Sequence, residues 1–360
     1  MGCGDRNCVL ASGSPEECSN QESQWEEPMF GLIDGSTENI NVLFFLVCVT
    51  AIYIPLMLFG LLGNILTILV VWLRPHMRSS TYLYLSSMAV SDLLILLLLP
   101  LDLYKLWRPR PWPLGDLVCK VTMFLSECCT FCTILHITCL SLERYLAVCW
   151  PITAKTVVTR RRTRSLIGCL WLGAAISAAP VLVMVGVEEV GTKGWRERVG
   201  ELNFETDKSE CRCTHYAVSS GLLSAMMVLS NLYFLVPLCI LGLVYSLIGR
   251  TLWLRPRSSR RDQSHRHTVK MLGVIVLAFV LCWLPFHVGR TIFSLSLGTS
   301  YFNLVSSVLF YLSAAVNPLL YNLMSARYRR AVHSLVRTRC RAESHRLRAP
   351  LAARHSTTTL

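Results

Sequence analysis

The chain has 360 residues, of which 53% are hydrophobic and only 16% are charged, and its formal net charge is +13. Soluble globular proteins usually carry about 25% charged residues, so the shortfall indicates a chain that turns much of its surface to lipid. The basic residues are divided among short segments between apolar stretches, which argues against nucleic-acid binding and favours contact with anionic lipid.

Residues 1–42 are acidic and rich in Ser, Gly and Glu, which predicts a tail without a cleavable signal peptide. Seven long apolar stretches lie between residues 43 and 324, and each is able to cross a bilayer. Because lipid offers no hydrogen-bond partners to the backbone, such stretches must be helical. We therefore predict an all-α membrane protein, a seven-transmembrane helix bundle. Its spans are Leu43–Leu73, Thr81–Leu106, Leu117–Cys149, Ser165–Val185, Val218–Ile248, Thr268–Leu295 and Tyr301–Leu323.

Residues 325–360 form the last segment. In residues 326–337, arginines and apolar residues alternate at helical spacing, which predicts a short amphipathic helix on the membrane surface. Cys340 follows and is a candidate for palmitoylation, with an unmodified cysteine as the alternative. The Ser- and Thr-rich end is a candidate kinase substrate.

The distribution of charge predicts the orientation of the chain. If the N-terminus is extracellular, the cytoplasmic segments contain 24 of the 35 Lys and Arg residues. The first tail and the loop of residues 187–212 contain fifteen acidic residues between them. Because cytoplasmic loops are enriched in Lys and Arg, we expect a multi-pass plasma-membrane protein with its C-terminus, residues 325–360, in the cytoplasm.

Polar residues inside membrane helices are costly and therefore suggest function. Asp92 lies in the middle of the second stretch, at a depth similar to that of Asn64, Thr133, Ser313 and Asn317. A carboxylate surrounded by hydroxyl and amide oxygens suits a sodium ion. A water-filled polar network without an ion explains the same residues equally well.

Glu127 and Arg290 lie in the outer half of the third and sixth stretches. Glu127 is eight residues from Cys119, or about 12 Å along a helix. Each charge alone is expensive to bury, and a pair offsets much of that cost, so we predict an ion pair across the cavity. Asp102 adds a second acid near the outer end of the second stretch, with simple exposure as the alternative.

Three motifs lie in the third, sixth and seventh stretches. Pro285 and Pro318 interrupt the last two stretches, and each creates a hinge. Trp283 precedes Pro285 in the sequence Cys-Trp-Leu-Pro, and residues 317–321 read Asn-Pro-Leu-Leu-Tyr. Residues 143–145, Glu-Arg-Tyr, place a charged pair at the inner end of the third stretch. Each motif alone is a weak pattern, but the three in this order, in these stretches, are highly specific for one family of membrane proteins.

The chain resembles the rhodopsin-like G-protein-coupled receptors, and within them it is similar to the ghrelin (growth hormone secretagogue) receptors, with the motilin receptors next. The matching residues are Asn64, Asp92, Cys119, Glu143, Arg144, Tyr145, Trp171, Pro237, Tyr245, Cys282, Trp283, Pro285, Asn317, Pro318 and Tyr321. The longer shared stretches are Tyr84–Leu94, Val244–Leu252, His267–Leu272, Leu281–Arg290 and Leu309–Asn317.

The resemblance implies roles for these residues. Arg144 would be held by Glu143 at rest and released to meet a G protein, and the acid expected at the inner end of the sixth helix is missing. High ligand-free signalling is therefore expected. The other implied switch residues are Ile134, Pro237, Tyr245, Phe279, Trp283 and Tyr321.

The resemblance also implies a disulfide and a ligand site. Cys119 would bridge to Cys211 in the long outer loop, although Cys213 is a rival partner. The implied ligand residues are Asp102, Glu127, Phe286, Arg290 and Phe310, with Met123 where ghrelin receptors carry Gln.

The implied partners are an extracellular, ghrelin-like peptide hormone and a heterotrimeric G protein, Gq, that raises calcium through phospholipase C. Arrestin and receptor kinases are further expected partners. A motilin-like receptor, or a constitutively active one with a weak ligand response, is the alternative. An enzyme is not expected, because the sequence has no metal-ligand cluster, phosphate-binding Gly-rich loop or paired catalytic carboxylates. An opsin is excluded because residues 301–323 contain no lysine.

Overall fold

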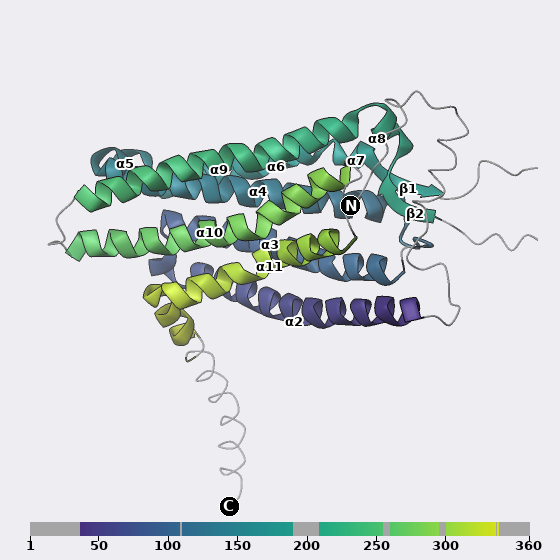
Figure 1. Ribbon diagram of the computed structural model, residues 1–360. Helices are drawn as coiled ribbons and strands as arrows, with labels where there is room; N and C mark the ends of the chain where they lie inside the picture. The colour runs from purple at the N-terminus through teal and green to yellow at the C-terminus, as the bar shows by residue number, and fades with distance from the viewer. Residues whose placement is uncertain are drawn as a thin grey trace, which may run out of the picture.

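Seven long helices form one bundle in the computed structural model, which describes residues 37–108, 110–189, 209–254, 260–294, 300–335 and 337 (Figure 1). The central helix, α4, packs against α3, α6 and α9, while α2 packs against α3 and α11, and α10 packs against α11 and α9. The bounds are α2 Thr37–Leu73, α3 Ser80–Trp107, α4 Gly115–Cys149, α6 Arg160–Ala178, α9 Leu222–Leu254, α10 Arg260–Ser294 and α11 Ser300–Met324.

The lipid-facing character of the bundle agrees with the predicted fold class. Among the described residues, five helical segments are long and apolar enough to span a membrane: α2, α3, α4, α9, and α6 together with α7 (Val181–Met184). Two shorter apolar segments, Gly273–Gly289 and Val305–Leu320, lie in α10 and α11. Large apolar side chains such as Phe59 on α2 face outward, as expected where lipid is the solvent.

Two of the predicted spans are interrupted. The fourth was predicted to run to Val185, but α6 ends at Ala178 and α7 follows Pro180, because proline has no N–H to continue the helical hydrogen bonds. The fifth was predicted to start at Val218. Instead, the short helix α8 (His215–Ser219) ends before Gly221, whose φ of 76° only glycine adopts readily, and α9 begins after it.

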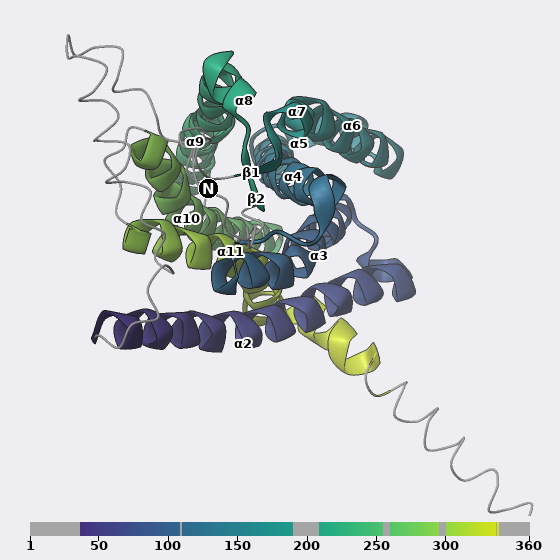
Figure 2. The same cartoon turned by 90° about the vertical axis from the view of Figure 1, so that its right-hand side faces the viewer.

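The outer loop contains a β-hairpin that the sequence did not predict. Strand β1 (Val185–Glu189) pairs antiparallel with β2 (Ser209–Cys213), in a register that places Val187 opposite Cys211. Figure 2 views the bundle from the end that carries this hairpin.

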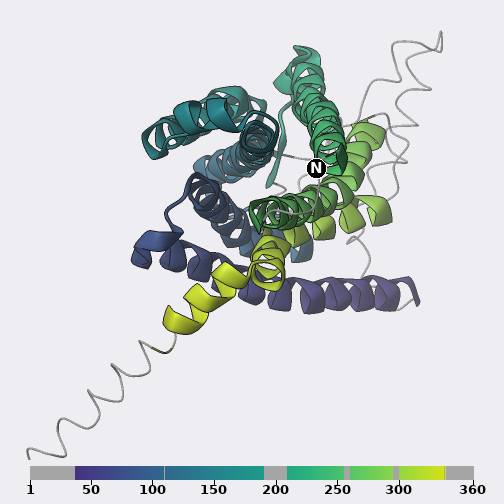
Figure 3. The same cartoon turned by 90° about the vertical axis from the view of Figure 1, so that its left-hand side faces the viewer.

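The opposite end carries three short elements, and Figure 3 views the bundle from this side. They are a 3-10 helix, η1 (Pro75–Met77), the helix α5 (Pro151–Val157) and a helix over residues 326–335. The last of these is amphipathic as predicted, with Tyr328, Ala331 and Leu335 buried. Tyr328 shares a hydrogen bond of 3.0 Å with Thr67 of α2, and burial raises the pKa of its phenol, which keeps the hydroxyl protonated.

Close approach of helices fixes the position of α2. A Cβ atom at Gly63 would lie only 2.8 Å from Cβ of Pro318, and one at Gly60 would lie 2.6 Å from Cδ1 of Leu96. Both distances are shorter than real carbon–carbon contacts, so α2 reaches α3 and the proline of α11 only because glycine stands at both positions.

Candidate functional site

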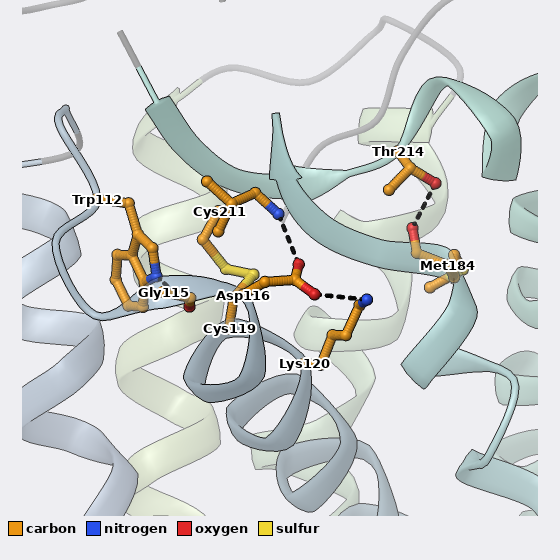
Figure 4. A network of polar contacts seen from close by, with 9 residues as sticks. Trp112, Gly115, Asp116, Cys119, Lys120, Met184, Cys211 and Thr214 are labelled. Carbon is orange, nitrogen blue, oxygen red and sulfur yellow. Dashed lines mark hydrogen bonds and ion pairs between the residues drawn. A yellow bond between two sulfur atoms is a disulfide. The ribbon is translucent and has the colours of Figure 1, made fainter. Parts of the chain in front are cut away.

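A disulfide joins the outer hairpin to the start of α4. Cys119 lies in the second turn of α4 and is bonded to Cys211 of β2, which confirms the predicted pairing (Figure 4). Cys213, the rival partner, is disulfide-bonded as well and is therefore not available to Cys119. The bridge fixes the hairpin across one end of the bundle.

Polar contacts reinforce this attachment (Figure 4). The carboxylate of Asp116 accepts a hydrogen bond from the backbone N–H of Val187 at 3.0 Å and pairs with Nζ of Lys120 at 2.6 Å. The indole N–H of Trp112 donates to the carbonyl of Gly115, while its backbone N–H donates to the carbonyl of Ser209. The hairpin thus rests on α4 and on the connection that precedes it.

Asp102 lies at the outer end of α3, within a polar cluster. Its carboxylate accepts a hydrogen bond from the hydroxyl of Tyr311 on α11, and the ring of Tyr311 lies 5.4 Å from that of Tyr53 on α2. One turn farther along α3, Nζ of Lys105 donates to the carbonyl of Cys211 at 2.5 Å. Asp102 therefore joins α3 to α11, and simple exposure at the interface does not describe it.

Two other predicted ligand residues lie on α4, facing the interior. Met123 packs with the outer core around the disulfide, and Glu127, one turn deeper, is only 7% exposed. A carboxylate at this depth requires a compensating charge or hydrogen bonds. The side chain of Arg290 lies outside the described residues, so its pairing with Glu127 stays a prediction.

An aromatic cluster joins the predicted ligand residues to the predicted switch. Phe286 and Phe310 stack at 5.2 Å between ring centroids, and both contact the ring of Trp283, at 5.8 Å and 5.3 Å. Trp283 in turn lies 5.7 Å from Phe279, which is one turn earlier in α10. A displacement of either outer ring would therefore reach Trp283 directly.

The inner part of this cluster is continuous with the bundle core. Phe279 packs 6.2 Å from Phe234 of α9, and both belong to the same buried core as Ile134 of α4. Pro237 is buried one turn beyond Phe234. Of the predicted switch residues, Ile134, Phe279 and Trp283 therefore belong to one packed core, which also contains Phe234.

The two hinge prolines lie inside α10 and α11, as predicted. The hydroxyl of Ser306 on α11 donates to the carbonyl of Pro285 at 3.2 Å. Pro318 lies beside Gly63 of α2. Each hinge is thus in contact with a neighbouring helix.

Asp92 is fully enclosed and is bound by Asn317, whose amide nitrogen donates to Oδ2 of the carboxylate at 3.0 Å. The two predicted hydroxyl ligands have other partners. Thr133 shares a hydrogen bond with Ser91, and Ser313 donates to a carbonyl of its own helix. Of the residues predicted to hold a cation, which also include Thr133 and Ser313, the structure brings Asp92 and Asn317 into direct contact.

Glu143, at the inner end of α4, is bound by hydroxyl groups of two other helices. Ser80 and Tyr84 of α3 donate to its carboxylate at 2.5 Å and 2.9 Å, and Thr163 of α6 donates at 3.4 Å. The predicted resting contact with Arg144 is not among the ion pairs of the described residues. The carboxylate thus accepts three hydroxyl donors in this structure, and the resting contact with Arg144 stays a prediction.

The side chain of Arg144 is partly buried at the inner end of α4. Tyr245 of α9 packs against both the main core and a smaller inner core formed by Val148, Val244, Ile248 and Leu252. Tyr145 accepts a hydrogen bond from the indole of Trp150 at 3.4 Å. The side chain of Tyr321 and the whole of Cys340 lie outside the described residues, so their roles stay predictions.

Two features of the inner end were missed by the reasoning from sequence. One is the set of hydroxyl groups around Glu143, which come from ordinary polar residues at helix starts. The other is Ile152 of α5, which is 83% exposed although it is apolar. The sequence Pro-Ile directly after the third span was the available signal for an exposed apolar contact.

The comparisons with known proteins agree with this architecture. The family model "7 transmembrane receptor (rhodopsin family)" matches residues 63–321. The growth hormone secretagogue receptor type 1 of Homo sapiens is 52% identical over 304 residues, covering 80% of each chain. The motilin receptor of Homo sapiens is 44% identical over 336 residues, covering 82% of each chain, and the neurotensin receptor type 1 of Rattus norvegicus is 32% identical over 341 residues, covering 83% of this chain and 78% of its own.

These relatives are receptors and not enzymes, and the match includes the helices that carry the disulfide, the aromatic cluster and the Glu-Arg-Tyr motif. Because the family match covers most of the chain and the bundle has the corresponding helices, the chain belongs to the rhodopsin family of seven-transmembrane, G-protein-coupled receptors and is closely related to the growth hormone secretagogue and motilin receptors.

Proposed function

We propose that the chain is a plasma-membrane receptor for an acylated, ghrelin-like peptide hormone. The observation that carries this proposal is the higher identity to the growth hormone secretagogue receptors, at 52%, than to the motilin receptor, at 44%. The predicted ligand residues, which match those of ghrelin receptors apart from Met123, support it.

In the proposed binding mode, the peptide contacts the outer loops and Asp102, and its acyl chain enters beside Glu127 and Arg290. The enclosed position of Glu127 supports a charge partner there, because an unpaired carboxylate at this depth would be costly. The stacked rings of Phe286 and Phe310 supply an apolar surface that suits an acyl chain.

The first test is calcium release in cells that express the chain, after addition of acylated ghrelin, deacylated ghrelin or motilin. A response to acylated ghrelin at the lowest concentration supports the proposal. A response to motilin alone would favour the runner-up, which the 44% identity to the motilin receptor supports. Equal ligand-free and ligand-stimulated calcium signals would favour a constitutively active receptor.

The ion pair is tested by charge reversal. Glu127→Arg or Arg290→Glu should abolish the response, and the double variant should restore part of it. Potency that survives both single changes, with no gain in the double variant, would refute the pairing.

On the inner side, we propose that Arg144 and α5 contact a heterotrimeric G protein, Gq, when α10 swings outward about Pro285. Arrestin and receptor kinases would bind the same end afterwards. The exposed Ile152 supports this contact, because an apolar side chain there gains from burial in a partner. Ile152→Ala should reduce the coupling to Gq, measured as inositol phosphate release, without changing hormone affinity.

A sodium ion near Asp92 is a further part of this proposal. The enclosed carboxylate of Asp92 supports such an ion, because a negative charge inside a membrane helix is costly unless a cation or hydrogen bonds compensate it. Asp92 and Asn317 would hold the ion together with Thr133 and Ser313. Asp92→Asn should remove the dependence of hormone affinity on sodium concentration.

The placement of the chain in the membrane is proposed from its charge distribution. Residues 1–42 are extracellular, residues 43–324 form the receptor domain, and residues 325–360 form the cytoplasmic segment, with palmitate on Cys340. The enrichment of Lys and Arg in the segments assigned to the cytoplasm supports this. Antibody labelling of tags at the two termini of intact cells tests the orientation, and Cys340→Ser tests the palmitate.

A further inference from the structure

The last residue of strand β2, Cys213, forms a disulfide of its own. This bond is distinct from the bridge between Cys119 and Cys211. Because alternate residues of a strand share one face, Cys213 lies on the same side of β2 as Cys211, the side that packs on the bundle. Cys213 is accordingly half-buried against the outer core, while Arg212 between the two cysteines is exposed. The hairpin is therefore cross-linked at a second position.

An account of the other cysteines narrows the choice of partner for Cys213. The chain has 16 cysteines. Within the part of the chain that the structure describes, nine of them have free thiols. Two more, Cys119 and Cys211, are bonded to each other. The cysteines that remain as candidates are Cys3, Cys8, Cys18 and Cys340.

Distance excludes Cys340. It is five residues beyond Leu335, which ends the short helix at the inner end of the bundle, and five extended residues span at most about 18 Å. The hairpin lies at the opposite end (Figure 1), separated from the inner end by the length of helices such as α3, whose 28 residues extend about 42 Å. Cys340 is therefore too far from Cys213.

The three cysteines of the N-terminal tail are within reach. They precede α2, and this helix begins at the same end of the bundle as the hairpin (Figure 1). Even Cys18 is 19 residues before Thr37, the first residue of α2, and 19 extended residues can span about 60 Å. The connection to α2 is thus long enough to bring any of the three to the hairpin.

We propose that Cys213 is bonded to one of the tail cysteines, Cys3, Cys8 or Cys18, and that this second bridge ties the N-terminal tail to the outer hairpin. Two thiols become one S–S bond, and a disulfide-bearing oxidoreductase of the secretory pathway accepts the two electrons and two protons by thiol–disulfide exchange. The proposal relies on the orientation given above, because such bonds persist outside the cell.

The bridge makes the end of the tail a closed loop. Residues from the bonded cysteine to Thr37 are held at one end by α2 and at the other by β2, which the first disulfide fixes to α4. A cut inside this loop would leave the residues before the cut attached to the receptor. Without the bridge, the same cut would release them.

The direct test is peptide mapping of the purified full chain by mass spectrometry, without reductant and after free thiols have been alkylated. Trypsin cleaves at Arg6 and Arg212, and protease Glu-C cleaves at Glu16, so the tail cysteines and the two hairpin cysteines fall on separate peptides. We expect the peptide that begins at Cys213 to be linked to a tail peptide and to be released by reduction. An alkylated Cys213, or a link from it to any other cysteine, would overturn the proposal.

A second test uses intact cells. The chain carries an epitope tag before Met1 and a site for a specific protease inserted after Phe30, between the tail cysteines and α2. Surface labelling of the tag before cleavage shows that the orientation is right. After cleavage, we expect the tag to stay on the cells until dithiothreitol is added. A tag that is labelled at first and lost on cleavage alone would contradict the bridge while the orientation holds.

Variants identify the cysteines. Cys213→Ser should release the tag on cleavage without reductant, and Cys3→Ser/Cys8→Ser/Cys18→Ser should do the same while leaving the hairpin unchanged, which guards against misfolding. The control is Cys239→Ser, because this cysteine is exposed and free and its loss should leave the tag attached. Retention of the tag by both the Cys213 variant and the triple variant, or a covalent dimer of the wild-type chain on a gel without reductant, would refute the proposed pairing.

Discussion

If Glu143 holds Arg144 at rest, the hydroxyl groups around Glu143 compete with Arg144 for the carboxylate, and the change Tyr84→Phe should weaken this competition. Tyr84 is fully buried, and its ring packs edge-on against His136 at 6.0 Å. Phenylalanine preserves that packing and removes only the hydroxyl, which donates to Oε1 of Glu143 at 2.9 Å. We therefore expect Glu143 to turn more often to Arg144, the contact that family resemblance associates with rest.

The size of the effect follows from the loss of one hydrogen bond to a charged acceptor, which is worth about 1.5–3 kcal/mol. A shift of about 1.4 kcal/mol changes an equilibrium tenfold. If half of the lost free energy favours the resting contact, ligand-free signalling should fall about threefold to tenfold. The bonds from Ser80 and Thr163 remain, so the fall should be incomplete.

Ligand-free inositol phosphate release, normalised to the amount of receptor at the cell surface, measures this effect. Tyr82→Phe is the matched control, because this hydroxyl, two residues earlier on α3, bonds to Ser325 and not to Glu143. Ligand-free signalling that stays constant or rises in Tyr84→Phe, at normal surface expression, would refute the competition between Tyr84 and Arg144.

Two further predictions concern stability. Gly63→Ala should lower the thermal stability of the purified receptor, because the new Cβ would lie 2.8 Å from Pro318 and such overpacking costs about 1–3 kcal/mol. The control is Gly173→Ala, where nothing lies within 4 Å of the new Cβ, and this change should be neutral or stabilising. Equal effects of the two changes on thermal stability would contradict the steric explanation. Cys119→Ser/Cys211→Ser opens a link between residues 92 apart and should cost about 4.6 kcal/mol by the chain-entropy estimate, seen as loss of hormone binding and of surface expression. Normal surface expression of that double variant would argue against a stabilising role.

The helices of the bundle were predictable because a long apolar stretch in lipid must form its backbone hydrogen bonds internally, as a helix. The same apolar composition concealed the two interruptions, since hydrophobicity continues through Pro180 and Gly221 while the backbone hydrogen bonds do not. The hairpin was missed because its strands, VGVEE and SECRC, lack a regular alternation of polar and apolar residues. Its geometry depends on the disulfide and on contacts with α4, which come from distant parts of the sequence.

The site was predictable where single residues carry a strong signal. A proline within an apolar stretch, a buried acid such as Asp92 and the Glu-Arg-Tyr motif are visible one at a time. The partners of Glu143 were not, because Tyr84 and Thr163 are common residue types whose contact depends on how α3, α4 and α6 pack. Reasoning from sequence therefore identified the charged groups but not the hydroxyl groups that donate hydrogen bonds to them.

The hairpin of the outer loop is fastened to one side of the bundle. The bonds of Cys211 and Lys105, and those of Asp116 and Val187, connect it to α4 and α3. The proline hinge Pro285 belongs to α10, between Trp283 and Phe286 of the aromatic cluster. A hormone that contacts both the hairpin and α10 would therefore meet a fixed element and a hinged helix. Its binding should displace α10 and leave the outer loop in place.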